Sequence, residues 1–333
     1  MTAHKLGQLR TGTAGGMVAI DDTAIAVCGL RKAYGDKIVL DDIDLDVRAG
    51  TVFSLLGPNG AGKTTTVNVL TTLLKADGGS VRVAGHDVAT EAKAVRAVIG
   101  VTGQFAAVDD LLTGEENLQL MADLHHLRAG EGKRVVTSLL ERFDLVEPAQ
   151  KTAATYSGGM RRKLDLAMTL VTRPQIIFLD EPTTGLDPRS RRTMWTIIRE
   201  LVADGVTVFL TTQYLEEADH LANRVAVLHQ GHLVAEGTPD ELKRQVPGSH
   251  VRLEFTDVAG LDAAARVLTG STMDDAALTL RVPSDGKAKS VRALLDRLDE
   301  HSIEVEEFSV HTPDLDEVFL ALTGHASTEE NAR

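Results

Sequence analysis

The chain has 333 residues, of which 43% are hydrophobic and 25% charged, so it can bury the cores of about two globular domains. Its formal net charge of −13 argues against a protein that binds nucleic acid by neutralising phosphates. The single cysteine, Cys28, leaves no intrachain disulfide, and no run approaches the roughly 18 apolar residues of a membrane span.

The first predicted elements precede a glycine-rich segment. Residues 1–22 are predicted to be a flexible leader, because they lack an apolar core. Strands are expected at Ala24–Val27 and Ile43–Val47, with a polar loop at Arg31–Lys37 between them. A further short strand is expected at Ser80–Val83. Apolar and acidic residues alternate in the second strand, which indicates an antiparallel sheet with one solvated face.

The glycine-rich segment fits the phosphate-binding pattern G-x-x-x-x-G-K-[ST] and lies between an expected strand, Thr51–Leu56, and the start of a helix. Glycines let backbone N–H groups converge on phosphate oxygens, and a helix N-terminus adds partial positive charge. Lys63 is expected to reach the β- and γ-phosphates, and the Thr64 hydroxyl to bind Mg²⁺. The predicted nucleotide-binding residues of this segment are Gly57, Pro58, Asn59, Gly60, Ala61, Gly62, Lys63, Thr64 and Thr65.

The pattern becomes helical over about residues 104–170. Thr113 and Glu116 form a capping box at one helix start, and a second helix is expected at Arg134–Phe143. Buried strands are then predicted to alternate with helices, which indicates a parallel sheet covered on both faces. These strands are Ile176–Leu179, Thr207–Leu210 and Val225–Leu228.

Two carboxylates follow the first of these strands. Because the strand is apolar and buried, Asp180 and Glu181 are expected at the carboxyl edge of the sheet, beside the glycine loop. Asp180 is predicted to hold Mg²⁺, and Glu181 to polarise the attacking water. An apolar run followed by Asp-Glu is weak evidence alone, since most such pairs simply end strands.

Tyr156-Ser157-Gly158-Gly159-Met160 resembles the Leu-Ser-Gly-Gly-Gln signature of ATP-binding cassette (ABC) ATPases. Ser157 is suited to cap a helix, while Gly158 and Gly159 expose backbone N–H groups to a phosphate. In isolation, Ser-Gly-Gly is usually only a helix cap. Other segments resemble the same family in the right order: Tyr34 matches the aromatic that stacks on adenine, Gln104 the Q-loop residue that contacts Mg²⁺, and Asp187 the D-loop.

This resemblance implies an α/β fold, that of a P-loop NTPase ABC cassette, over residues 23–246. It would comprise a parallel-sheet core, an antiparallel β-subdomain and an inserted helical subdomain. In the family, two cassettes bind head to tail, and each signature segment completes the ATP site of the other copy. The implied cofactors are ATP and Mg²⁺. The implied partners are a second copy and an integral-membrane permease, which would hold the chain at the cytoplasmic face of the membrane.

Two positions depart from the family pattern. Gln213 replaces the switch histidine in Thr211-Thr212-Gln213, and glutamine cannot take up a proton. Gln213 can still touch the γ-phosphate and orient water, so slow but real hydrolysis is predicted. Met160 replaces the signature glutamine, which removes a polar contact.

A small α+β domain is predicted at residues 250–324, after a boundary at Pro247–Ser249, with a disordered tail at 325–333. From Val251 onward the chain holds 8 Lys/Arg and 17 Asp/Glu, a balance of −9. Its last helix, Leu315–Leu322, fits either core packing or partner docking. This helix and both substitutions resemble the ATPase subunits of daunorubicin-resistance-type exporters.

The predicted function is therefore ATP hydrolysis that drives a separate membrane permease, for drug or antibiotic export. Two alternatives remain open at this point: a soluble cassette ATPase, and a regulatory nucleotide-binding module with little catalysis. The sequence identifies neither the transported substrate nor the permease.

Overall fold

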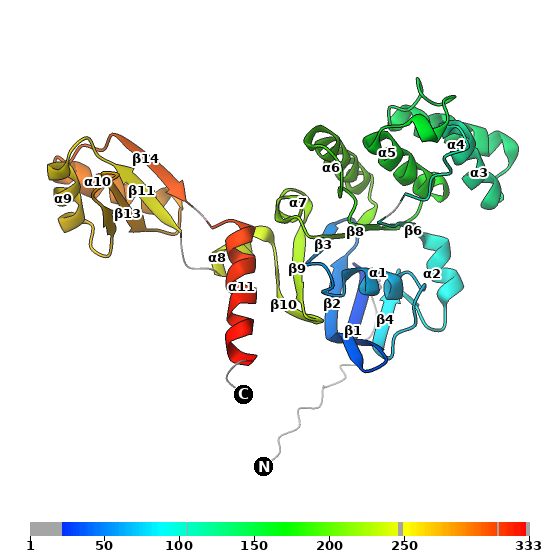
Figure 1. The fold of residues 1–333 in the computed structure, drawn as a ribbon, viewed down its shortest axis with the longest axis horizontal. Helices are drawn as coiled ribbons and strands as arrows, with labels where there is room; N and C mark the ends of the chain where they lie inside the picture. Colours follow the sequence, from blue (N-terminus) through cyan, green and yellow to red (C-terminus); the bar gives the residue numbers. More distant parts are fainter. Residues whose placement is uncertain (1–21, 105, 246–248, 312, 331–333) are drawn as a thin grey trace, which may run out of the picture.

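The computed structural model describes residues 22–104, 106–245, 249–311 and 313–330. A cassette with two β-sheets and a helical subdomain is followed by a smaller module that stands apart from it (Figure 1). Among the described residues, no helix is both long and apolar enough to cross a lipid bilayer. The predicted leader at 1–22 falls almost wholly outside the described residues.

The strands are β1 (Thr23–Tyr34), β2 (Lys37–Arg48), β3 (Val52–Leu56), β4 (Gly78–Val83), β5 (His86–Asp87), β6 (Ile99–Thr102), β7 (Ile176–Asp180), β8 (Thr207–Thr212), β9 (Arg224–His229), β10 (His232–Gly237), β11 (His250–Glu254), β12 (Thr272–Asp274), β13 (Thr279–Pro283) and β14 (Glu307–His311). The α-helices are α1 (Lys63–Leu70), α2 (Ala92–Val98), α3 (Gly114–Leu124), α4 (Ala129–Arg142), α5 (Gly158–Thr169), α6 (Pro188–Ala203), α7 (Leu215–Leu221), α8 (Pro239–Gln245), α9 (Val258–Val267), α10 (Ala288–Glu300) and α11 (Leu315–Glu330).

The central sheet has the order β10-β9-β3-β8-β7-β6, and all neighbours except β10 and β9 are parallel. Its inner strands β3, β7 and β8 are buried along their whole length, and β9 over its four central residues, as the sequence predicts. In β7, Ile176 and Phe178 pack into one core, while Ile177 and Leu179 pack into another on the opposite face. This two-sided burial fixes the register, because a slip of one residue would exchange the two sets of side chains.

The second sheet is antiparallel, with the order β2-β1-β4-β5. The prediction of a polar loop at Arg31–Lys37 is wrong for most of these residues, because β1 continues to Tyr34 and β2 begins at Lys37. Only Gly35 and Asp36 form the turn, and Tyr34 pairs with Lys37. Polar side chains suit this hairpin because its end is exposed on both faces, so the sequence lacks the apolar alternation that indicates a strand.

The helical subdomain contains α3, α4 and α5, which agrees with the predicted helical block. Thr113 and Glu116 form the predicted capping box, with Thr113 N donating to Glu116 Oε2 at 2.8 Å. One continuous hydrophobic core joins this subdomain to one face of the parallel sheet, through residues such as Leu118, Phe143 and Leu164. The short elements α2, β6 and β10 are not among the predicted elements.

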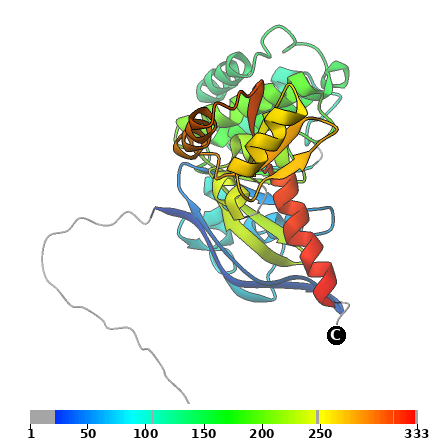
Figure 2. The same cartoon turned by 90° about the vertical axis from the view of Figure 1, so that its left-hand side faces the viewer.

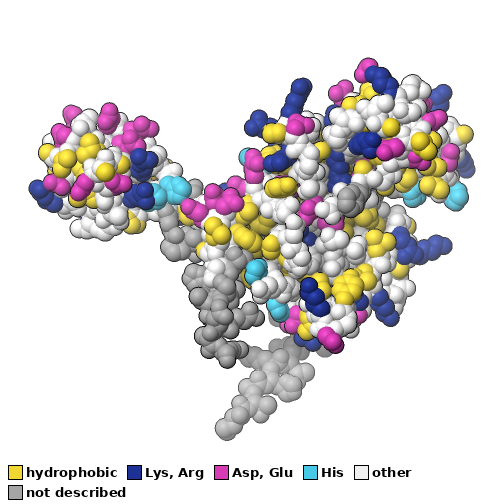
Figure 3. Space-filling view, in the orientation of Figure 1, with side chains coloured by type: hydrophobic (Ala, Val, Ile, Leu, Met, Phe, Trp, Pro, Cys, Tyr) yellow, Lys and Arg dark blue, Asp and Glu magenta, His cyan; other side chains and the backbone are white. Residues whose placement is uncertain are grey.

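The C-terminal module is built on an antiparallel sheet with the order β12-β13-β11-β14. Its core contains Leu253, Leu261 and Leu280 together with Leu294 and Leu298 of α10. Strand β14 begins only at Glu307, and Ile303, which follows α10, is buried in the core of this module. Acidic side chains are frequent on the visible face of this module (Figure 3).

The last helix, α11, does not lie on the module's sheet. Leu315 and Val318 are buried against Leu242 of α8, Ala218 of α7 and Val227 of β9 (Figures 1 and 2). The chain therefore leaves the cassette, forms the module and returns to the cassette. Helix α11 also continues to Glu330, where the sequence predicts a disordered tail from residue 325; alanine and glutamate there favour a helix. Residues 331–333 lie outside the described residues.

Candidate nucleotide-binding and hydrolysis site

The glycine loop joins β3 to α1, as predicted, and close packing explains two of its glycines. A Cβ atom at Gly57 would lie 2.4 Å from the carbonyl oxygen of Leu228. Gly62 has a φ of 114°, and a Cβ there would lie 2.7 Å from Leu40 Cδ2. The loop therefore keeps its backbone against β2 and β9, and its N–H groups converge at the start of α1, where a phosphate is favoured.

Lys63 begins α1 and is only 5% exposed. Its ammonium donates hydrogen bonds to the carbonyl oxygens of Gly57 at 2.8 Å and Pro58 at 3.1 Å. It also forms an ion pair with Glu181 Oε1 at 3.3 Å. The three donors of this ammonium are thus directed at the loop and at the predicted catalytic carboxylate.

Asp180 ends β7 and is 4% exposed. One of its oxygens accepts a hydrogen bond from Thr64 Oγ1 at 2.9 Å, and the other accepts one from the Thr211 hydroxyl. The structure therefore brings two of the three predicted magnesium-binding residues, Thr64 and Asp180, into direct contact. Hydroxyl and carboxylate oxygens, with phosphate oxygens, form the hard donor set that Mg²⁺ prefers.

Glu181 lies next to Asp180 and is 8% exposed. Its backbone φ of 49° lies in the left-handed region, which is costly for glutamate and is held by two hydrogen bonds. Its N–H donates to the carbonyl oxygen and to the hydroxyl of Thr211, both at 3.1 Å. Its Oε2 accepts from Thr184 Oγ1 at 3.2 Å. The carboxylate is therefore held in a defined position beside Lys63.

Gln104 and Gln213 complete the same edge of the sheet. Gln104 lies two residues after β6, and Gln213 directly after β8. Both strands are parallel to β7, so these side chains start from the edge that carries Asp180 and Glu181. No described contact joins either glutamine to the carboxylates, so their roles remain predictions.

The signature and D-loop residues lie on exposed helix starts. Ser157 Oγ accepts from the N–H of Met160 at 3.2 Å and caps α5, as predicted. Asp187 caps α6, and bonds from the Ser190 hydroxyl and then from backbone N–H groups lower the pKa of its carboxyl. A Cβ at Gly159 would lie 2.6 Å from Ser190 Oγ, so these segments pack together. No described contact joins them to their own glycine loop.

Comparison with known proteins agrees with this geometry. A family model described as ABC transporter matches residues 40–184, and one described as ATP-binding protein DrrA1-3-like, C-terminal domain, matches residues 237–323. Daunorubicin resistance ATP-binding protein DrrA3 of Streptomyces coeruleorubidus is 51% identical over 91% of this chain and 96% of its own length. The chain belongs to the ABC transporter ATP-binding proteins. Its enzymatic activity is ATP hydrolysis of the ABC type.

Two further comparisons extend this result. Daunorubicin/doxorubicin resistance ATP-binding protein DrrA of Streptomyces peucetius is 48% identical to this ABC protein over 93% of the chain and 96% of its own length. Among solved structures, the ATP-binding subunit of an ABC transporter is 30% identical with a TM-score of 0.60, over 67% of this chain and 93% of that one. A dimeric ATP-binding cassette in a post-hydrolysis state, bound to ADP and Pi, is 25% identical with a TM-score of 0.59, over 64% of this chain and 98% of that one.

Tyr34, the predicted adenine-stacking residue of this ABC ATPase, lies at the end of the β1–β2 hairpin and is 52% exposed. The Lys32 ammonium lies 5.7 Å from the centre of its ring. The same hairpin supplies Val39 and Leu40, which contact the Gly62 position of the glycine loop. The hairpin thus flanks the loop, and stacking of Tyr34 on adenine remains a prediction.

Sequence reasoning missed three buried polar residues of this ABC cassette: Thr211, Arg162 and Glu217. Thr211 holds both Asp180 and Glu181, while Arg162 bonds to main-chain carbonyls behind them. The position of Thr211 at the end of a predicted buried strand could have indicated that it lies beside the carboxylates. Arg162 follows Ser157 in a helix with several basic residues, and the sequence alone suggests that all of them are exposed to solvent. Its burial is seen only in the folded structure.

Glu217 of α7 is fully buried. Its Oε1 accepts from Trp195 Nε1 at 3.2 Å, and the hydroxyls of Thr212 and Thr183 also interact with its carboxyl. Burial is the largest influence on this carboxyl and raises its pKa above the ordinary value of 4.5. The folded ATPase therefore retains a proton on Glu217 at pH values where the unfolded chain has lost it.

Replacing Glu217 by glutamine is expected to raise the melting temperature at neutral and alkaline pH. Since the folded pKa lies above the unfolded value, the cost of burying the carboxyl is absent below pH 4.5 and grows as pH rises toward the folded pKa. Thermal melts of the wild type and Glu217→Gln from about pH 5 to about pH 9 should diverge with rising pH. Glu216→Gln, with a 58% exposed side chain, is the matched control. An equal effect of Glu217→Gln at every pH would contradict a raised pKa, because a pH-independent difference means that the carboxyl has the same pKa in the folded and unfolded states.

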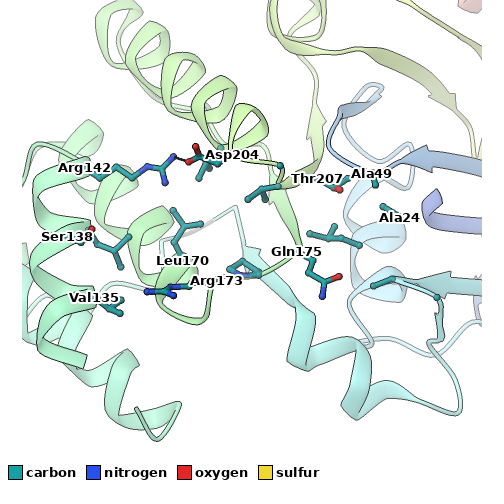
Figure 4. A pocket seen from close by; sticks show the side chains of 18 of the residues that line it. Ala24, Ala49, Val135, Ser138, Arg142, Leu170, Arg173, Gln175, Asp204 and Thr207 are labelled. Carbon is teal, nitrogen blue, oxygen red and sulfur yellow. Dashed lines mark hydrogen bonds and ion pairs between the residues drawn. The ribbon is translucent and has the colours of Figure 1, made fainter. Parts of the chain in front are cut away.

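A cavity of about 1180 Å³ lies at the opposite end of the central sheet (Figure 4). It is lined by Ile176 and Thr207, the first residues of β7 and β8, and by residues of α4. Arg142 of α4 reaches across to Asp204 after α6, with Nη2 2.6 Å from Oδ2. Because the glycine loop follows the carboxyl end of β3, this cavity is separate from the nucleotide site.

Proposed function

We propose that this chain is the ATP-hydrolysing subunit of an exporter for amphipathic drugs or antibiotics. In this proposal, two copies bind head to tail around Mg-ATP and drive a separate integral-membrane permease at the cytoplasmic face of the membrane. The observation that carries the proposal is the division of the site. Lys63, Asp180 and Glu181 meet beside the glycine loop, while the Ser157 helix start faces solvent and contacts no part of that loop. A second copy would supply that segment.

The residues present fit a magnesium ion. Thr64 and Asp180 would hold it together with Gln104, and the ion would neutralise charge on the β- and γ-phosphates. Lys63 would exchange its loop carbonyls for phosphate oxygens. Glu181 would orient and polarise the attacking water, and Gln213 would contact the γ-phosphate and hold that water from the other side. Without a proton-accepting histidine at that position, slow turnover is expected.

Exposed apolar side chains in and before α3 of the helical subdomain support a membrane partner. Leu111 is 87% exposed, and Leu120 and Leu124 of α3 are 41% and 62% exposed. Leu120 and Leu124 are four residues apart, so they share one face of the helix. Solvent-exposed leucines provide an apolar surface on which a permease can bind.

The drug class comes from the names of the relatives, two of which are resistance proteins for daunorubicin or doxorubicin. Cells that express this chain together with a candidate multi-span permease are expected to accumulate less doxorubicin than cells with either protein alone. Fluorescence of intracellular doxorubicin measures this, with the Glu181→Gln pair as the inactive control. Equal accumulation with the wild-type and Glu181→Gln pairs would reject drug export. Sedimentation of the chain with membranes only when that protein is present tests the permease partner separately.

A further inference from the structure

Arg162 is a buried cation behind the catalytic edge. It lies on α5, five residues after Ser157, and is 7% exposed. Its guanidinium donates to three main-chain carbonyl oxygens: from Nε to Pro182 at 2.9 Å, from Nη1 to Gly103 at 2.7 Å and from Nη2 to Asp180 at 3.2 Å. One side chain of the signature helix therefore touches the ends of β6 and β7 and the residue after Glu181.

Asp165 completes this arrangement one helical turn later. It is 3% exposed, and its Oδ2 accepts from Arg162 Nη1 at 3.1 Å. Its Oδ1 accepts from the N–H of Ala107 at 2.9 Å. Gly103 and Ala107 lie on either side of Gln104 in the chain, so the Arg162–Asp165 pair holds both ends of the segment that carries Gln104.

The chemistry of the pair argues for positioning. Buried ion pairs contribute little stability compared with apolar residues of similar size, because desolvation opposes their attraction. Here the guanidinium donates its hydrogen bonds to carbonyl groups of the catalytic segments, and its planar geometry fixes the orientation of these segments relative to one another. The surface neighbours Arg161 and Lys163 pair instead with the exposed residues Asp110 and Asp144.

We propose that Arg162 is a positioning residue that couples the orientation of the signature helix to the placement of Gln104, Asp180 and Glu181. This inference rests on the proposed ATP-dependent pairing of two cassettes. When α5 moves to meet the nucleotide of a second copy, the Arg162 fork carries the Gln104 segment and the end of β7 with it. Signature engagement and alignment of the hydrolytic carboxylates then occur as one event.

Steady-state ATPase assays of Arg162→Met and Arg162→Lys test the inference. Both are expected to lower kcat by roughly 10- to 100-fold while the KM for ATP changes by less than about 3-fold, since the glycine loop is untouched. Lysine should not rescue, because one ammonium cannot span three fixed carbonyl groups. Arg161→Gln is the matched control and should retain the wild-type kcat.

A double-mutant cycle separates positioning from general destabilisation. The losses of kcat for Arg162→Met and Gln104→Ala should be non-additive, because both act through one segment, whereas independent sites add. Fully additive losses, or wild-type kcat in folded Arg162→Met, would overturn the inference. Should Arg162→Met fail to fold, isosteric Asp165→Asn gives the same readout, and an unchanged kcat there would count against it. A wild-type protein that neither hydrolyses ATP nor dimerises would instead refute the proposed function.

Discussion

Replacing Glu181 by glutamine is expected to lower ATP turnover by roughly 10²- to 10³-fold while leaving nucleotide binding almost intact. Glutamine keeps the size of the side chain and an oxygen for Thr184, but it cannot accept a proton from water. Because hydrolysis is what would reopen the paired cassettes, the variant should accumulate as a dimer in Mg-ATP and remain a monomer in Mg-ADP. Phosphate release and mass photometry measure the two effects.

The exposed Glu200→Gln on α6 is the control for this change, and it should behave as the wild type. A monomeric Glu181→Gln protein in saturating Mg-ATP would contradict the pairing of two copies around nucleotide. Wild-type phosphate release from the same variant would show that another group activates the water. The dimer measurement is interpreted together with phosphate release, because a variant that still hydrolyses ATP would reopen and need not accumulate as a dimer.

The local chemistry of the site could be predicted because each segment carries its own geometry. The glycine loop needs only a strand, a helix start and the correct spacing of Gly57, Gly62 and Lys63. The carboxylates need only an apolar strand that ends in Asp180 and Glu181. Parallel strands then place their carboxyl ends at one edge, so adjacency of these segments follows from the fold class alone.

Long-range contacts could not be predicted in the same way. Arg162 lies in a helix with several basic residues, and nothing in its neighbours indicates that it points inward at carbonyl groups from β6 and β7. Thr211 is one of several threonines near a strand end, and its two contacts depend on the order of β7 and β8. The contacts of Arg162 and Thr211 join segments that are far apart in the chain, and a single sequence does not show which distant segments meet.

The C-terminal region shows the same limit. The sequence predicts a helix after Leu315 and leaves packing and docking as alternatives, and the structure shows packing for Leu315 and Val318. The sequence does not predict that this helix packs on α7 and α8. Since α7 begins two residues after Gln213, the apolar contacts of α11 lie one short helix away from the position where the family has its switch histidine.

Replacing Lys63 by methionine is expected to weaken ATP binding by roughly 10²-fold or more. The ammonium would make charge-assisted hydrogen bonds to phosphate oxygens, and methionine supplies the length without the donors. Isothermal calorimetry with Mg-ATP measures the loss, and the exposed Lys75→Met is the control. An affinity within about 2-fold of the wild type would reject the phosphate role of Lys63.

The same change has a consequence for stability that only the structure predicts. Lys63 lies 3.3 Å from Glu181 in a pair where both groups are almost fully buried, so methionine leaves the carboxylate without its counter-charge. Removing one partner of a buried pair is strongly destabilising, and Lys63→Met should therefore melt at a lower temperature than the wild type. Adding Glu181→Gln should restore the melting temperature without restoring ATP affinity. If ATP binding draws Lys63 toward phosphate, it also releases Glu181 from this ion pair. The bound nucleotide would then free the carboxylate that polarises the attacking water.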